Sequence, residues 1–312
     1  MNIRDFNKND YQILVDLQNA IYPDIQAVVD DYINHDKLLD PKCKLRRWIA
    51  EKNGQPIGGG WYWQNAWLYD PQRFHFMIRV FPEFQNKGVG TALYEIIIKS
   101  LKEFNPNELR ITVRESISEG LKFVEKRGYT ELIRDQSSEL EVNAFDSSKY
   151  SGIENKLKSK EIEIKTVTEL KKESQWDRKL YSLFMELIKD VPGMEESSEI
   201  NFEQWAKTEL NIQDVPHDCY FVAINNNNFI GLSYAFVDLA SDMLLTGLTA
   251  VKSDYRKQGI ATAMKLKVIE YAKKNHKPII RTGNEPDNPM LNINLQLGFK
   301  KIPAWIEFII KL

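Results

Sequence analysis

Residues 251–272 read V-K-S-D-Y-R-K-Q-G-I-A-T-A-M-K-L-K-V-I-E-Y-A, and this stretch decides how the rest of the chain is interpreted. The apolar run Leu244–Val251 leads into it and has the length of a buried strand. The turn at 256–261 then carries two cations and a series of backbone N–H groups, so it presents a helix N-terminus to an anion. The helix itself is indicated by apolar residues that recur every three or four positions, at Ala261, Met264, Val268 and Ala272.

The same pattern occurs earlier in the chain, in Val80–Leu93. Gly88 aligns with Gly259 at an offset of 171 residues (259 − 88 = 171), and no gap is needed. A constant offset over several positions indicates a duplicated domain. The other pairs at this offset are Val80 with Val251, Phe84 with Tyr255, Thr91 with Thr262 and Ala92 with Ala263.

The composition fits a globular protein with two domains. The chain has 312 residues, of which 43% are apolar and 28% are charged, enough for two hydrophobic cores. The formal net charge of −2 gives no overall basic field for nucleic acid, and no apolar run reaches membrane-spanning length. Cys43 and Cys219 lie in different halves and show no metal-ligand spacing. With an N-terminus that lacks the apolar segment of a signal peptide, these features predict a cytoplasmic protein.

Each half is expected to contain the same order of elements, β-α-α-β-β-β-α-β-α-β, which is an α/β (α+β) fold with a mixed sheet. Residues 143–160 are rich in Ser, Asn, Lys and Asp and indicate a linker. We predict a domain over 1–145, a linker over 146–160 and a second domain over 161–312. The expected strands of the first half begin with a short segment at Ile3 and continue at about 48–51, 57–63, 74–80, 108–113 and 129–141. Those of the second half lie at about 162–166, 221–224, 229–232, 244–251, 278–282 and 305–310.

Two features of the first half allow more than one interpretation. The Gly58–Gly60 run resembles a phosphate loop, but an aromatic, strand-like segment follows it, so we prefer a bulge or a close backbone approach. Trp61 and Trp63 share one face of the expected strand, where they could line a substrate groove or, more usually, belong to the core. His75 precedes the turn, where a packed or exposed histidine is more usual than a catalytic one.

Gln85-x-x-Gly88-x-Gly90 and Arg256-x-x-Gly259-x-Ala261 each lie between an expected strand and a long helix. Both satisfy the pattern [RQ]-x-x-G-x-[GA], and a Gly-aromatic pair follows each about forty residues later. In motif and element order the chain resembles the GCN5-related N-acetyltransferase (GNAT) superfamily. In its duplication it is similar to the tandem-domain members, such as mycothiol synthases, and the resemblance covers nearly the whole chain except the linker.

The resemblance implies acetyl-CoA as the cofactor and acetyl transfer to a primary amine of a small molecule or peptide, without a metal. Backbone N–H groups of the turn would bind the coenzyme pyrophosphate. The strand that ends at Val251 would lie along the pantetheine arm, with a backbone N–H polarising the thioester carbonyl. The predicted cofactor-binding residues are Leu248, Thr249, Val251, Arg256, Lys257, Gln258, Gly259, Ile260, Ala261, Thr262, Asn284 and Asn288 in the second half, and Val80, Gln85, Asn86, Lys87, Gly88, Val89, Gly90 and Thr91 in the first.

The catalytic residues are less well marked. Members of the family often carry a tyrosine acid four residues before the final Gly, but Val124 and Asn294 stand there in the two halves. A tyrosine acid is therefore not expected in either half. Glu307, Asp238 and Glu285 are candidates for the base from their expected sheet positions, beside the alternative of a solvated or structural role.

The second half is the better candidate for the catalytic half. Asn284 and Asn288 follow its fifth expected strand, where family members often contact the pantetheine arm, although loop capping explains them equally well. The equivalent Arg114–Ile117 of the first half lacks this feature, so we expect a degenerate or second acetyl-CoA site there. A non-catalytic CoA-binding regulatory module is the alternative function. The sequence specifies neither the acceptor amine nor the oligomeric state.

Overall fold

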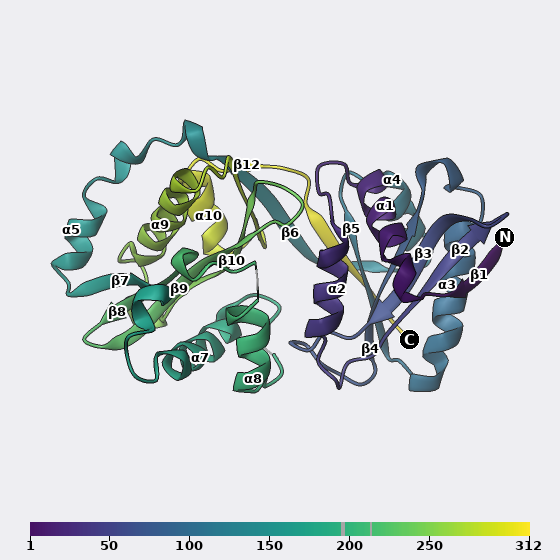
Figure 1. Cartoon of the computed structure of the whole chain (residues 1–312), viewed down its shortest axis with the longest axis horizontal. Coiled ribbons are helices and arrows are strands. Elements are labelled where there is room, and N and C mark those ends of the chain that lie inside the picture. The colour runs from purple at the N-terminus through teal and green to yellow at the C-terminus, as the bar shows by residue number, and fades with distance from the viewer. Residues whose placement is uncertain (195–196, 213) are drawn as a thin grey trace. The chain divides into compact units, whose positions relative to one another are not determined.

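A computed structural model describes residues 1–194, 197–212 and 214–312, which divide into two compact units (Figure 1). The first unit comprises Met1–Ile133, Leu239–Ser241 and Trp305–Leu312. The second comprises Arg134–Asp238 and Asp242–Ala304. Each unit contains strands with both parallel and antiparallel neighbours, which confirms the predicted α/β fold with a mixed sheet.

In the first unit the strand order is β1-β2-β3-β4-β5-β13, and β4 and β5 are its parallel pair. Helix α3 packs on one face of the sheet through Leu93 and Ile97, and α1 covers the other face through Leu14. The elements are β1 (Asn2–Asp5), α1 (Tyr11–Ile21), α2 (Val29–Leu38), β2 (Leu45–Lys52), β3 (Gln55–Trp63), β4 (Arg73–Val80), α3 (Val89–Leu101), β5 (Glu108–Arg114), α4 (Ser118–Glu125) and β13 (Trp305–Lys311).

In the second unit the strand order is β6-β11-β10-β9-β8-β7, with β12 also paired to β6. Helices α9 and α10 lie on one side of this sheet and α7 and α8 on the other (Figure 1). The elements are β6 (Thr130–Glu141), α5 (Ile153–Lys158), β7 (Ile162–Thr166), α6 (Val167–Leu170), α7 (Trp176–Leu187), α8 (Phe202–Trp205), the π-helix η7 (Ala206–Leu210), β8 (Tyr220–Asn225), β9 (Asn228–Val237), β10 (Leu244–Val251), α9 (Ile260–Lys274), β11 (Ile279–Asn284), α10 (Pro289–Gln296) and β12 (Lys300–Lys301). Short 3-10 helices occupy Lys8–Asp10, Pro82–Phe84, Lys102–Phe104, Val142–Ala144, Ser147–Tyr150, Ile188–Asp190, His217–Cys219 and Ser253–Tyr255.

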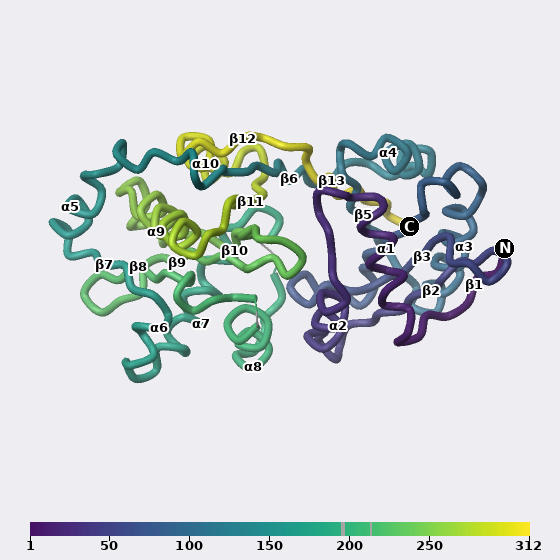
Figure 2. The backbone as a smooth tube through the Cα atoms, turned by 45° about the horizontal axis from the view of Figure 1, so that its top comes forward, coloured from purple at the N-terminus to yellow at the C-terminus, as the bar shows by residue number. Residues whose placement is uncertain are grey.

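The last strand of each half pairs with the fifth strand of the other half. β13 runs antiparallel to β5 over Trp305–Lys311, and the yellow end of the chain lies beside β5 in Figure 2. β6 runs antiparallel to β11 over Gln136–Glu141. The sequence predicts both strands but places residues 305–310 at the end of the second half. It could not reveal the exchange, because a residue pattern identifies a strand without identifying the strand beside it.

The glycine run and the tryptophans of β3 belong to the packed interior. A Cβ atom at Gly60 would lie 3.2 Å from Ile97 Cδ1, so the run confirms the predicted close approach of helix and strand. Trp61 is 8% exposed and packs with Leu14 in a hydrophobic cluster. Trp63 stacks on His75 with ring centroids 5.4 Å apart. The core interpretation of these aromatic residues is therefore confirmed.

The segment expected as a linker is partly helical. It contains the 3-10 helix Ser147–Tyr150 and helix α5. Leu157 is 3% exposed, and Ile153 packs against the core of the second unit. A few apolar side chains thus pack this segment against the second unit, although its overall composition is polar.

The strand exchange makes a prediction about stability. Phe308 on β13 is 5% exposed in the core of the first unit, so Phe308→Ala should destabilise that unit by about 3–5 kcal/mol through the cavity it leaves. Amide hydrogen exchange should show lost protection in β5 and retained protection in β11. The matched control is Phe299→Ala, which removes an equally buried side chain from the core of the second unit and should give the reverse pattern. Loss confined to β11 in Phe308→Ala would contradict the exchange.

Candidate functional site

The two motif turns share one backbone conformation. The φ angles are +57° at Asn86 and +85° at Gly88, and they are +59° at Lys257 and +91° at Gly259. Each glycine is the N-cap of the following helix, α3 or α9. Glycine adopts this left-handed region without a steric penalty, so the pattern reflects a geometric requirement. The duplication seen in the sequence is thus a duplication of structure.

The first motif residue ties each turn to the end of its strand. Gln85 Nε2 donates a hydrogen bond to the carbonyl oxygen of Val80 at 3.0 Å. Arg256 Nε donates to the carbonyl oxygen of Val251 at 2.9 Å. Arg256 also forms an ion pair with Asp190, so its guanidinium already has partners within the protein. The structure therefore gives Arg256 a part in shaping the turn.

Each turn leaves a row of backbone donors unused. The first helical hydrogen bonds run from Ala92 N to Gly88 O and from Ala263 N to Gly259 O. Within the described residues, the N–H groups of 86–91 and of 257–262 have no protein acceptor. Consecutive free N–H groups at a helix N-terminus form an anion site, so the predicted turn residues fit a pyrophosphate.

Beside each turn, the parallel strands separate. β4 pairs with β5 only over Arg73–His75, and β10 pairs with β11 only over Leu244–Leu245. Beyond these residues the facing backbone edges of the two strands no longer bond to each other. On β10 this stretch includes the predicted residues Leu248, Thr249 and Val251, which fit an extended ligand arm that bonds to main-chain groups.

A β-bulge distinguishes the second unit from the first. The register of β9 with β10 shifts between Thr246 and Thr249, which leaves Gly247 and Leu248 outside the ladder. The register of β3 with β4 is continuous over Gly58–Trp63. Bulges redirect backbone groups and are over-represented beside active sites. This difference favours the second half as the reactive one, as the sequence predicted.

The polar residues after β11 bond to one another. Asn288 accepts a hydrogen bond from Met290 N, so it caps helix α10, and its Nδ2 donates to Glu285 at 2.9 Å. Asn294 is fully buried and donates to Asn284 Oδ1 at 2.6 Å. The capping role that the sequence left open for Asn288 is therefore present. Contact of Asn284 or Asn288 with the cofactor stays a prediction.

The three candidate bases lie in different places. Glu307 lies on β13 in the first unit, where it contacts His75 at 3.4 Å and Arg110 at 3.3 Å. Burial raises the pKa of this carboxyl, but His75 and Arg110 outweigh burial and hold the pKa below its usual value. Glu307 therefore completes an ion-pair cluster of the first sheet, and a role as the base stays a prediction. Asp238 lies in the turn after β9, where its N–H donates to Met243 O, and Glu285 lies directly after β11.

The sequence did not reveal the role of Tyr234, a buried tyrosine beside the bulge. The ring of Tyr234 comes within 2.3 Å of the position that a Cβ atom would take at Gly247, so only glycine fits there. Its hydroxyl donates to Glu209 in the π-helix η7 at 2.6 Å, and its ring stacks on Tyr220. Burial and the nearby Glu209 raise its pKa well above the usual value, so it keeps its proton at neutral pH. The available signal was Gly247, since glycine within a strand indicates a close approach.

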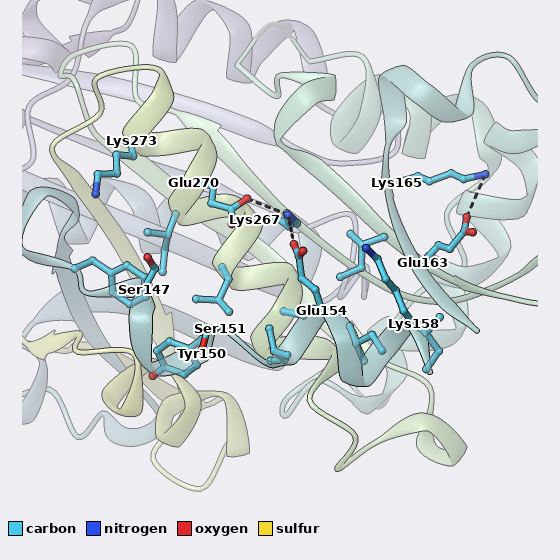
Figure 3. A pocket seen from close by; sticks show the side chains of 18 of the residues that line it. Ser147, Tyr150, Ser151, Glu154, Lys158, Glu163, Lys165, Lys267, Glu270 and Lys273 are labelled. Carbon is cyan, nitrogen blue, oxygen red and sulfur yellow. Dashed lines mark hydrogen bonds and ion pairs between the residues drawn. The ribbon is translucent and has the colours of Figure 1, made fainter. Parts of the chain in front are cut away.

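A large cavity lies elsewhere in the second unit. It has a volume of about 840 Å³ and is lined by the segment 145–158, by β7 and by α9 (Figure 3). Lys267 extends from α9 and pairs there with Glu154 at 2.5 Å and with Glu270 at 3.1 Å. None of the turn residues 256–262 lines this cavity, so we do not count it as part of the site.

The repeated anion turn, the separating parallel strands and the mixed sheet define the GNAT class of acyltransferase fold. The sequence profile of the Acetyltransferase (GNAT) family matches residues 11–129 and 178–299. The chain therefore belongs to the GNAT family, with one copy of the domain in each half. Acetyl-CoA is the cofactor of this family, and the free N–H groups of both turns fit its pyrophosphate.

Solved structures of GNAT proteins share the fold over nearly the whole chain. A tandem GNAT protein from the clavulanic acid biosynthesis pathway matches with a TM-score of 0.77 and 15% identity, over 99% of this chain and 98% of that one. A GCN5-related N-acetyltransferase from Sphaerobacter thermophilus gives 0.72 and 15%, over 99% and 95%. Identities this low establish similarity of fold. The comparison with curated proteins gave no match to this sequence.

The described residues contain neither a membrane-spanning helix nor a cluster of metal ligands. None of their helices combines the length and the apolar character that crossing a membrane requires. No group of three or more His, Cys, Asp or Glu among them is arranged to hold a metal ion.

The left-handed glycine gives a direct test of the turn. Gly259→Ala should lower the free energy of unfolding by about 1–2 kcal/mol, because an L-residue is strained at φ +91°. Gly152→Ala is the control, since Gly152 has φ −93° and open space around it, and it should change stability little. Urea titration of both variants measures the difference. Equal effects would contradict the strain argument.

Proposed function

We propose that the chain is an acetyl-CoA-dependent N-acetyltransferase whose second half transfers the acetyl group to a primary amine of a small molecule or peptide. Family membership supports acetyltransferase activity in general. The observation that carries the choice of half is the bulge at Gly247 and Leu248, which lies on the separated strand beside the anion turn and has no counterpart on β4.

The residues of the second half have distinct roles in this proposal. The N–H groups of 257–262 bind the coenzyme pyrophosphate, and Arg256 holds the turn against Val251. The unpaired main chain of β10 from Gly247 to Val251 positions the pantetheine arm, and an N–H at the bulge faces the reacting carbonyl. Acetyl-CoA supplies an activated thioester, so the protein has to align the amine and accept its proton.

The alternative is a regulatory module that binds CoA without turnover. Asn294 favours it, because this residue occupies the place of the family's tyrosine acid and is fully buried against Asn284. In the enzyme proposal no tyrosine acid is needed there, since a thiolate is a tolerable leaving group. The two functions differ in whether any amine is acetylated.

We further propose that the protein works in the cytoplasm. The sign is that both cysteines of the chain, Cys43 and Cys219, are buried free thiols. The net charge of −2 gives no general attraction to nucleic acid. The oligomeric state is left open.

Release of the CoA thiol in the presence of acetyl-CoA and a panel of amines tests the function. Gly259→Trp should abolish turnover, because an L-residue is strained at φ +91° and its side chain would begin against Ile153, which distorts the turn that carries the N–H groups. Gly88→Trp is the matched change in the first turn and should retain turnover. Acetyl-CoA binding by the wild type without turnover of any amine would favour the regulatory module. Turnover lost only in Gly88→Trp would show the first half to be catalytic.

A further inference from the structure

Two glycines lie at matching positions where β10 and β11 separate. The strands pair at Leu245 and Arg281, and the hydroxyls of Thr246 and Thr282 bond to each other one residue further on. Gly247 and Gly283 are the next residues. Successive side chains of a strand point to opposite faces of the sheet. A side chain at Gly247 or Gly283 would therefore point to the face opposite the threonine hydroxyls. Each glycine leaves room that a side chain of a neighbouring strand fills.

Asp135 fills the room over Gly283. A Cβ atom at Gly283 would lie 2.2 Å from Asp135 Oδ2 and 2.4 Å from Oδ1, so the carboxylate lies directly on the backbone of β11. Asp135 belongs to β6, which comes from the first half of the chain and pairs with β11 through the strand exchange. The carboxylate therefore lies over Gly283, in the part of β11 that no longer pairs with β10, and the ring of Tyr234 lies over Gly247 in the same way on β10.

Asp135 is the carboxylate here that has no partner. Its Oδ1 is buried, and within the described residues it accepts no hydrogen bond. The other two carboxylates near these strand ends already accept hydrogen bonds. Glu209 accepts one from Tyr234, and Glu285 accepts one from Asn288. A buried carboxylate oxygen without a donor is costly unless a ligand supplies the donor.

The charges around Asp135 favour a cationic ligand. Glu285 is the charged group whose repulsion acts on it. On the same strands Arg134 has a partner of its own, and Arg281 pairs with Glu139. Burial first, and then repulsion by Glu285, raise the pKa of Asp135 to about 6. The carboxylate is thus ionised at neutral pH yet can take up a proton readily.

We propose that Asp135 is the general base of the second half and that, together with Glu285, it selects acceptors that arrive as protonated amines. This inference rests on the proposed function. Asp135 accepts a proton from the acceptor's ammonium group, and the nitrogen lone pair that this frees attacks the acetyl carbonyl. The new C–N bond forms as the C–S bond breaks. The sulfur leaves with the electron pair, and the second N–H proton is released to the thiolate or to water.

The first unit lacks this arrangement at the corresponding place. Arg114 stands 171 residues before Glu285, and it pairs on the neighbouring strand with Trp305. Arg114 is bound by both oxygens of Asp24, at 2.6 and 2.7 Å, and Trp305 packs on Tyr22. A paired cation and an indole there replace the two carboxylates, so this base belongs to the second half alone.

Asp135→Asn is the primary test. It should lower kcat/KM for the amine about 10²- to 10⁴-fold, as expected for loss of a general base, with unchanged acetyl-CoA affinity in calorimetry. The wild-type kcat/KM should rise with pH through a limb near 6, and the variant should lack this limb. Glu141→Gln changes an exposed carboxylate on the same strand and should behave as the wild type. Unchanged kcat/KM in Asp135→Asn would overturn the proposal.

Two further measurements separate this proposal from the proposed function and from misfolding. Asp135→Asn should raise the melting temperature clearly at pH 8 and much less at pH 4. The folded protein raises the carboxyl pKa from 3.8 to about 6, so the effect shrinks as the pH falls toward 3.8, where the unfolded state takes up the proton as well. Gly283→Ala should displace the carboxylate and lower amine turnover while Asp135 is retained. Absence of wild-type turnover with every amine would refute the function itself. Wild-type turnover together with full activity of both variants would refute only the role of Asp135.

Discussion

The left-handed backbone at Gly88 and Gly259 is the constraint on which the rest of each half depends. Because Gly88 and Gly259 adopt φ angles of +85° and +91° directly before a helix, consecutive N–H groups at each helix N-terminus are left without a backbone acceptor in the described residues. The neighbouring parallel strand has to separate at this point, since a ligand that reaches from the anion site along the strand needs the unpaired edge. The side chains of Gln85 and Arg256 keep this geometry by bonding to the strand-end carbonyls, so they act on the ligand through the turn.

The exchange of last strands changes which residues can belong to one site. Asp135 stands in the first half of the sequence but lies on a strand that pairs with β11, whereas Glu307 stands in the second half and pairs with β5. A carboxylate chosen by its distance from the turn along the chain is therefore assigned to the wrong sheet. The exchange also means that neither sheet is complete without residues from the other half, so the duplicated halves are not independent copies.

The sequence predicted the duplication, the element order and the two glycine turns, because these depend on local patterns and on glycine geometry. Strand β10, for example, has the predicted bounds Leu244–Val251. The choice of the second half as the catalytic one stays a prediction. The sequence did not predict the bulge, the Tyr234–Glu209 bond or the position of Asp135. Each of these depends on pairing between distant strands. The sequence signals were Gly247 and Gly283, because a glycine within a strand indicates a close approach to the backbone. It does not identify the side chain that approaches, which is Tyr234 at Gly247 and Asp135 at Gly283.

The two halves share the same turn, but the residues around the turn differ. This difference argues that the two halves have different functions. An anion turn by itself binds, since its donors act equally on a ligand before and during reaction, and uniform binding does not lower a barrier. Transfer also needs groups that act on the reacting atoms. The second half has a bulge in β10 and an unpartnered carboxylate over Gly283. The first half has a continuous register, a buried Phe76 at the position of Gly247 and an arginine bound to Asp24 near the corresponding strand end. These differences support the proposal that the first half binds a coenzyme without turnover and that the second half transfers the acetyl group.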